Sequence, residues 1–326
     1  MPRVREHNIS IGDLPTGAHN AITDVPGIRV GQTTIQEEGR FHTGVTAIVP
    51  DRLPIPAALF AGNGYGKLIG VTQVQELGEI ETPILLTGTL SAFRVADALV
   101  SWMLEQPGHE KTTSINPVVG ETNDGFLSDI RTRPITPEHV FAALNGASDG
   151  PVDEGCVGAG SGTRALGYKA GIGTSSRIVS AVDEDAPGSV FGPYTVGALV
   201  QSNFGGTLTV QGTPYPAPAI PAADKGSCMI VVATDAPLDA RQLERVARRA
   251  VFAMARVGAN YSHGSGDYAI AIGTRPKGAV PDAALTPIFG ATMDAVEEAL
   301  LNSLFMAQTT QGIEGRVMLA FDTARL

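Results

Sequence analysis

Apolar residues recur along the chain with two different spacings, and each spacing predicts a different kind of element. Two-residue alternation or a short apolar run predicts strands at about residues 28–35, 44–50, 82–87, 165–172, 175–182, 194–201, 207–211, 228–234 and 267–273. Helical spacing predicts helices over about residues 91–104, 137–144, 239–257 and 294–308. Strands and helices alternate in groups, and the long helices can cover strands from outside. We therefore expect a layered α/β structure.

The composition indicates a globular chain and argues against several partners. The 326 residues are 43% hydrophobic and 17% charged, which allows a substantial core in one large domain or two small ones. The net charge is −10 and no Lys/Arg run occurs, so neither nucleic acid nor an anionic membrane surface is expected as a partner. Cys156 and Cys228 lack metal-ligand spacing, and although a disulfide between them is an open alternative, two buried thiols are expected. No apolar signal segment or membrane-length run is present, so we expect a cytoplasmic protein.

Two glycine-rich segments, residues 58–70 and 154–163, invite a nucleotide-binding interpretation but lack its key residues. A phosphate-binding loop needs Ser or Thr after Gly-Lys, and here Leu68 follows Lys67. A dinucleotide-binding fingerprint needs a third glycine where this chain has Thr163. A Gly-x-Ser-x-Gly elbow and a His-Glu-x-x-His motif are also absent. Both segments therefore predict close-packed loops near a site.

Gly226 and Ser227 lie where a proline-rich run, residues 213–223, meets the apolar run at residues 228–234. The first run is expected to be extended and exposed, and the second to be a core strand. One interpretation is an ordinary loop-to-strand connection. The other is a self-cleavage point, at which Ser227 attacks the Gly226 carbonyl and hydrolysis of the ester frees Ser227 as a new N-terminus. Its α-amine, with a reference pKa of about 7.7–8.0, could then serve as base for its own hydroxyl.

Two further polar segments contain candidate carboxylates. Ser265 and Asp267 enter an apolar strand, and their i, i+2 spacing places both side chains on one face. A plain turn with side-chain-to-backbone hydrogen bonds explains the same residues. Glu121 lies in residues 120–125, which by their pattern alone predict an exposed turn. The six histidines are scattered, although His263 beside Ser265 keeps a histidine-based triad as a minor alternative.

Several segments, taken in order, resemble one known family over nearly the whole chain. They are residues 21–31, 44–48, 63–67, 121–125, 155–163, 203–205, 226–227 and 233–237. The family is the L-aminopeptidase/D-amino-acid esterase and β-aminopeptidase group (peptidase family S58 type), whose members are self-processing N-terminal serine hydrolases. The resemblance implies a four-layer α-β-β-α sandwich, like that of N-terminal-nucleophile hydrolases. It further implies one domain that cleaves itself into residues 1–226 and 227–326, and a homo-oligomer, commonly a tetramer of the α/β unit.

The resemblance also implies catalytic roles for four residues. Ser227 matches the nucleophile, and Ser265 and Asp267 match the pair that contacts the nucleophile and its amine. Family members often carry Glu at the second position of this pair, where this chain has the shorter Asp267. Asn203 matches the oxyanion donor, and loss of one such donor costs roughly 2.7–4 kcal/mol of transition-state stabilisation.

Substrate-binding residues are implied in the same way. Glu121 matches the carboxylate that holds the substrate's free amino group. Some family members have a tyrosine two residues later, where this chain has Asn123. Asn63, Tyr65 and Lys67 match residues that line the site.

The expected activity is release of an N-terminal amino acid from a small peptide, amide or ester through an acyl-enzyme on Ser227. No metal or organic cofactor is expected. Two alternatives stay open. One is an acyl transferase of related fold, in which an amine replaces water, and the other is a non-catalytic binding or assembly protein on the same scaffold.

Overall fold

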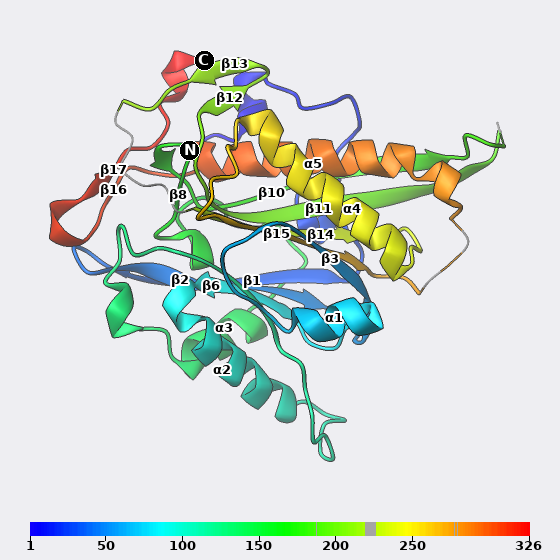
Figure 1. Ribbon diagram of the computed structural model, residues 1–326, viewed down its shortest axis with the longest axis horizontal. Helices are drawn as coiled ribbons and strands as arrows, with labels where there is room; N and C mark the ends of the chain where they lie inside the picture. The colour runs from blue at the N-terminus through cyan, green and yellow to red at the C-terminus, as the bar shows by residue number, and fades with distance from the viewer. Residues whose placement is uncertain (187, 219–225, 277, 279) are drawn as a thin grey trace.

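Two β-sheets form the centre of the molecule in a computed structural model, which describes residues 1–186, 188–218, 226–276, 278 and 280–326 (Figure 1). The first sheet has the order β1-β2-β6-β7-β4, and the second has the order β10-β11-β14-β15-β3-β5. The strands of the first sheet are β1 (Ile28–Glu37), β2 (Phe41–Pro50), β4 (Leu68–Ile69), β6 (Ile84–Gly88) and β7 (Val118–Thr122). Those of the second are β3 (Ile55–Gly64), β5 (Glu79–Ile80), β10 (Ile172–Val182), β11 (Val190–Asn203), β14 (Ser227–Thr234) and β15 (Gly266–Gly273).

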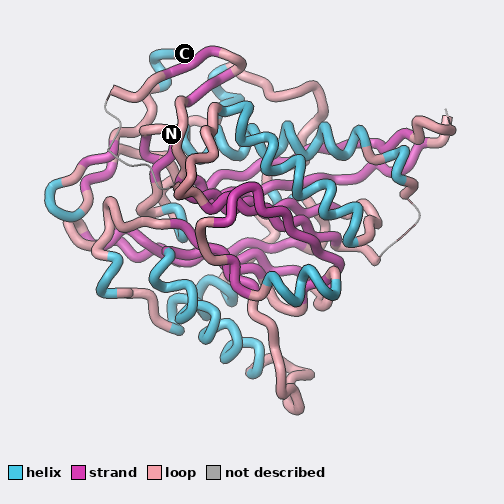
Figure 2. The backbone as a smooth tube through the Cα atoms, in the orientation of Figure 1, coloured by secondary structure: helices cyan, strands magenta, loops and turns pink. Residues whose placement is uncertain are grey.

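Helices cover the outer faces of both sheets, as Figures 1 and 2 show. Short strand pairs lie outside the main sheets: β8 (Arg164–Ala165) with β9 (Tyr168–Lys169), β12 (Leu208–Val210) with β13 (Thr213–Tyr215), and β16 (Thr310–Gln311) with β17 (Val317–Met318). The helices are α1 (Val71–Leu77), α2 (Ala92–Leu104), α3 (Pro137–Asn145), α4 (Ala240–Ala253) and α5 (Thr286–Phe305).

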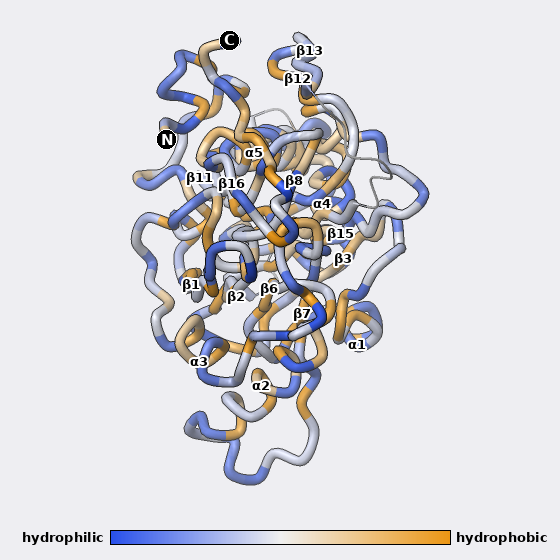
Figure 3. Tube along the Cα trace, turned by 90° about the vertical axis from the view of Figure 1, so that its left-hand side faces the viewer, coloured by the Kyte–Doolittle hydropathy of each residue, from blue (hydrophilic) through white to orange (hydrophobic). Residues whose placement is uncertain are grey.

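Three apolar clusters fix the order of the layers. Alternate residues of one strand point to opposite faces of a sheet. On the first sheet, Val45 and Leu85 accordingly pack against α2 and α3, whereas Ile48 and Leu86 face the second sheet. A third cluster joins the other face of the second sheet to α4 and α5, and Figure 3 shows these helices on the side opposite α2 and α3. The chain is therefore a four-layer α-β-β-α sandwich, which confirms the predicted fold class.

The connection between β14 and β15 determines where the site lies. These neighbouring strands are parallel, and parallel neighbours need a long crossover, which here contains α4. Asp239 caps α4 by accepting a hydrogen bond from the Gln242 N–H at 2.8 Å. Because the strands run in the same direction, their first residues, Ser227 and Gly266, meet at one edge of the sheet.

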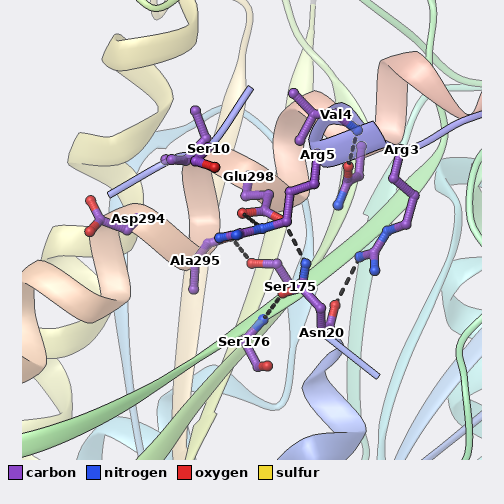
Figure 4. Close-up of polar contacts among 12 residues, drawn as sticks. Arg3, Val4, Arg5, Ser10, Asn20, Ser175, Ser176, Asp294, Ala295 and Glu298 are labelled. Atoms are coloured by element: carbon purple, nitrogen blue, oxygen red, sulfur yellow. Dashed lines mark hydrogen bonds and ion pairs between the residues drawn. The ribbon is translucent and has the colours of Figure 1, made fainter. Parts of the chain in front are cut away.

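The N-terminal segment is attached to α5 by a buried polar network (Figure 4). The Arg177 guanidinium donates to Glu298 at 2.6 Å, and Arg5 donates to the same carboxylate at 2.8 Å. Asn20 donates its side-chain amide to Glu298 at 2.5 Å. These donors hold the pKa of Glu298 below its usual value, although burial alone acts in the opposite direction. The Glu298 carboxylate is therefore fully paired in the interior, as a buried charge must be.

Several sequence-based predictions need correction. Residues 58–70 were expected to form a glycine-rich loop, but β3 continues to Gly64 because its backbone pairs with β15. The last helix begins at Thr286 and not at 294, with Pro287 in its first turn. Asp294, the expected start, lies mid-helix and pairs with Arg256 at 2.8 Å.

Two further predictions fail at single residues. Glu121 is only 2% exposed and belongs to β7, so the exposed turn predicted from residues 120–125 by pattern alone is wrong. Cys228 is a buried thiol as expected, whereas the free thiol of Cys156 is partly exposed. Of the proline-rich run, residues 219–225 lie outside the described residues.

Candidate active site

Ser227 lies where three distant segments of the chain meet. It is the first residue of β14, and it pairs with Gly266 at the start of β15 and with Asn203 at the end of β11. Ser227 is buried, with 6% of its surface exposed. The apolar run that follows anchors this strand in the core, so the backbone of the serine is held by both neighbours.

The hydroxyl group of Ser227 contacts the peptide bond that precedes it. Its Oγ donates to the carbonyl oxygen of Gly226 at 2.7 Å. The backbone N–H of Gly266 donates to the same oxygen at 3.2 Å. A donor on this oxygen polarises the carbonyl and is correctly placed to stabilise negative charge if the carbon is attacked.

The backbone of residues 203–205 explains why position 226 is a glycine. A Cβ atom added at Gly226 would lie 2.6 Å from the Cα atom of Phe204 and 2.7 Å from the carbonyl oxygen of Asn203. Both contacts are with backbone, which cannot rotate away as a side chain can. Glycine is therefore the residue that fits this close approach without a shift of the strand.

Ser265 and Asp267 form a buried hydrogen-bonded pair beside this junction. The Ser265 hydroxyl donates to Oδ1 of Asp267 at 2.7 Å, and both side chains are almost inaccessible to solvent. Within the described chain, Oδ2 of Asp267 has no hydrogen-bond partner. Burial raises the pKa of Asp267 to about 6, and the Ser265 hydrogen bond opposes this rise only in part. A cationic group placed nearby would find here a carboxylate that still needs a partner.

Asn203 has its side-chain oxygen already engaged. Its Oδ1 accepts the backbone N–H of Arg164 at 3.2 Å, which fixes the orientation of the amide group. The Nδ2 group of Asn203 makes no hydrogen bond to any of the described residues. Asn203 as a whole is 5% exposed and pairs with Ser227 at the end of β11, so its amide can act as a hydrogen-bond donor to a group bound beside Ser227.

A cleft of about 500 Å³ opens over Ser227. Its lining brings together the β3–β4 turn, the end of β7 and the β14 junction. The lining residues are Gly64, Tyr65, Gly66, Lys67, Thr89, Glu121, Asn123, Gly226, Ser227 and Gly264. The structure therefore places the sequence-predicted residues Tyr65, Lys67, Glu121 and Asn123 around one space with the serine.

Glu121 and Lys67 form an ion pair in this cleft. Nζ of Lys67 lies 3.3 Å from Oε1 of Glu121, and the backbone N–H of Lys67 donates to the same oxygen at 2.8 Å. Gly66 allows this approach, because a Cβ atom there would lie only 3.2 Å from Oε1. The carboxylate is held against the β3–β4 turn by two donors on one oxygen.

Asn63 and Asn123 have structural contacts of their own. Nδ2 of Asn63 donates to the Ser262 carbonyl at 2.7 Å and holds the turn before β15, and Asn63 is not among the residues that line the cleft. Asn123 lines the cleft, and its Oδ1 accepts the Gly125 N–H at 2.9 Å. Asn123 therefore shapes the turn after β7 with a local side-chain bond.

Sequence reasoning missed Thr89 and Asp124. Thr89 lines the cleft directly after β6, whose end lies beside the end of the parallel strand β7. Asp124 is fully buried, and desolvation raises its pKa to about 6, with the nearby Glu121 adding to the rise. The available signal was the position of both residues after apolar runs, because the ends of adjacent parallel strands share an edge.

No group of three or more His, Cys, Asp or Glu side chains in the described part of the chain is arranged to hold a metal ion. No helix in the described ranges combines the length and apolar character needed to cross a bilayer.

The fold and the serine at a strand start define the class of N-terminal-nucleophile-type hydrolases. Residues 20–318 match the family model for peptidase family S58, so the chain belongs to that family. This assignment agrees with the resemblance seen in the sequence.

Known relatives match over almost their whole length. The β-peptidyl aminopeptidase BapA of Sphingosinicella xenopeptidilytica is 38% identical, covering 95% of this chain and 86% of the relative. The solved structure of a β-aminopeptidase from Burkholderia sp. superposes with a TM-score of 0.88 at 36% identity, covering 99% of this chain and 97% of that one. The L-aminopeptidase D-Ala-esterase/amidase of Ochrobactrum anthropi, described as a variant of the Ntn hydrolase fold, superposes with a TM-score of 0.91 at 34% identity, covering 100% and 97%.

Proposed function

We propose that this protein is a self-processing serine aminopeptidase that also acts on amides and esters. The observation that carries the proposal is the contact between the Ser227 hydroxyl and the Gly226 carbonyl, made at the start of a core strand and facing a cleft. Membership in peptidase family S58 and the named activities of the relatives support it.

Processing begins when Oγ of Ser227 attacks the carbonyl carbon of Gly226. The Gly266 N–H stabilises the oxyanion, the C–N bond to Ser227 breaks, and the released nitrogen takes up the hydroxyl proton. Water then hydrolyses the ester, which leaves Gly226 as a carboxylate and Ser227 with a free α-amine. The products are residues 1–226 and residues 227–326.

In the catalytic cycle the new α-amine removes the Ser227 hydroxyl proton as Oγ attacks the substrate carbonyl. The Nδ2 group of Asn203 donates to the oxyanion, and the leaving amine takes the proton from the Ser227 ammonium. Water then attacks the carbonyl carbon of the acyl-enzyme, the α-amine takes a proton from this water and passes it to Oγ of Ser227 as the ester bond breaks, and the amino acid is released. With an ester substrate, the first leaving group is an alcohol in place of an amine. Asp267 and Ser265 orient the amine and stabilise its positive charge, and Glu121 binds the free amine of the substrate.

Intact-mass measurement under denaturing conditions tests processing, and hydrolysis of alanyl and β-alanyl p-nitroanilides tests the activity. We expect two fragments that break between Gly226 and Ser227, together with release of p-nitroaniline. An unbroken chain after long incubation, or product formation only when a second amine is supplied, contradicts the proposal; the latter result identifies an acyl transferase.

A further inference from the structure

The two charged side chains among the described cleft-lining residues are Glu121 and Lys67, and they are already paired with each other. If Glu121 binds the free amine of a substrate, this amine meets a carboxylate whose charge Lys67 partly neutralises. A substrate with an ammonium group alone therefore gains less from Glu121 than it would from an unpaired carboxylate.

The two partners differ in their access to the cleft. The Glu121 side chain is 3% exposed, whereas the Lys67 side chain is 38% exposed. Both donors to Glu121 use Oε1, and the described residues make no hydrogen bond or ion pair to Oε2. Oε2 is therefore free to accept from a substrate ammonium, while the Lys67 ammonium, which carries three N–H donors, keeps donors for an anion.

A group with both an ammonium and a carboxylate on one carbon complements this pair. Its ammonium donates to Glu121 and its carboxylate accepts from Lys67, so four alternating charges close a ring and no charge is left uncompensated. Charge-assisted hydrogen bonds are about twice as strong as neutral ones. A plain β-alanyl group offers only half of these contacts.

We infer that Lys67 makes the enzyme selective for N-terminal residues that carry a carboxylate close to their free amine. This inference rests on the proposed function and names its substrate class. The structure favours β-linked aspartyl peptides, in which the amine and the carboxylate share one carbon. An α-linked N-terminal aspartate has the same two charges, but its carboxylate lies one carbon farther from the amine. It is the second substrate class to be tested.

Initial rates on four p-nitroanilides separate these cases: β-aspartyl, β-alanyl, α-aspartyl and α-alanyl. We expect kcat/KM for β-aspartyl to exceed that for β-alanyl by about tenfold, the value of one charge-assisted hydrogen bond. Lys67→Met should reduce this ratio about tenfold, Lys67→Arg should retain it, and the matched control Lys111→Met, at an exposed lysine, should leave it unchanged. If the ratio of kcat/KM for α-aspartyl to that for α-alanyl is larger than the corresponding ratio for the β-linked pair, α-aspartyl peptides are the preferred substrates.

A binding measurement on the wild-type protein tests the inference without requiring that any variant folds correctly. Calorimetry on the wild-type protein should show L-aspartate binding about tenfold more tightly than β-alanine. Wild-type preference for β-alanyl and α-alanyl over both aspartyl substrates overturns the inference and leaves the proposed function intact. If none of the four substrates is hydrolysed, the proposed function has failed, and weaker binding of L-aspartate than of β-alanine then overturns the inference as well.

Discussion

The Ser227 hydroxyl donates to the carbonyl oxygen of Gly226 at 2.7 Å, so the candidate nucleophile and the carbonyl group that it would attack in processing are in contact in the folded chain. The β-pairing on both sides of Ser227 holds this contact in place. In the proposed processing reaction, such positioning would supply part of the barrier reduction, because the entropy of bringing the groups together is lost on folding and not during the reaction.

Replacing Ser227 with Ala should stop both reactions. The variant should stay a single chain and lose at least about a thousandfold in hydrolysis, because the nucleophile is gone. Intact mass and a p-nitroanilide assay measure the two effects. Ser101→Ala, on the exposed face of α2, is the matched control and should cleave normally. Cleavage at the same bond in Ser227→Ala would assign the nucleophile elsewhere.

Replacing Gly226 with Ala should slow processing by about tenfold or more. The added Cβ atom meets the backbone of Phe204 and Asn203 at under 3 Å, so the scissile carbonyl must move away from the Gly266 N–H. The time course of fragment formation measures this. Gly290→Ala is the control, since a Cβ atom there meets nothing within 4 Å; it should cleave at the normal rate and stabilise α5 by about 0.5–1 kcal/mol. Equal cleavage rates for Gly226→Ala and wild type would contradict the steric argument.

Asp267 should make the unprocessed protein less stable as the pH rises. Burial raises the pKa of Asp267 from 3.8 to about 6, so between these values the folded chain binds a proton that the unfolded chain releases. The free energy of unfolding therefore falls as the pH increases from about 4 to about 6, by about 3 kcal/mol at most.

Urea unfolding of Ser227→Ala and of Ser227→Ala/Asp267→Asn at pH 4 to 7 isolates this contribution. Buried Asp124 and Glu154 also have raised pKa values, of about 6 and about 7, and their contributions cancel in the difference between the two proteins. The double variant should gain stability relative to the single variant as the pH rises. If the free energies of unfolding of the two proteins change with pH in the same way, burial of the Asp267 carboxylate does not lower stability.

Replacing Asn203 with Ala should lower kcat by about 10²–10³ and change KM little, because a donor to the oxyanion acts in the transition state. The experiment uses chains already processed, with the fragments confirmed by mass. Asn63→Ala is the comparison, since Asn63 donates to the Ser262 carbonyl at 2.7 Å and holds a turn. A rise in KM at unchanged kcat for Asn203→Ala would place this amide in substrate binding.

Replacing Glu121 with Gln should weaken the selection for a free amine. The substitution keeps the shape of the side chain but removes its charge, so kcat/KM for an amino substrate should fall about tenfold to a hundredfold. The discriminating quantity is the ratio between an alanyl ester and its N-acetyl derivative, which should move toward one. An unchanged ratio would mean that another group recognises the amine.

Much of this architecture follows from local sequence patterns. The alternating residues 28–35 and the apolar run 228–234 form β1 and β14, and Thr136 is the N-cap of α3, as expected. These predictions succeed because periodicity reports which faces are buried. The start of α5 was misplaced because Pro287 and Gly290, both poor helix formers, lie near its beginning, whereas packing of this helix against β10 and β11 keeps the segment helical.

The sequence by itself determined the family and the identity of the candidate nucleophile, since Gly226-Ser227 and the segments that accompany it are linear motifs. Tertiary structure alone decided that Glu121 is buried and paired with Lys67, residues 54 positions apart in the chain. It also decided that Asp267 lies without a partner for one oxygen among the described residues, and that Ser227 begins a strand between Asn203 and Gly266. The reason is physical: burial and strand pairing arise from contacts between distant segments, and these contacts set the charge state and the approach of each group.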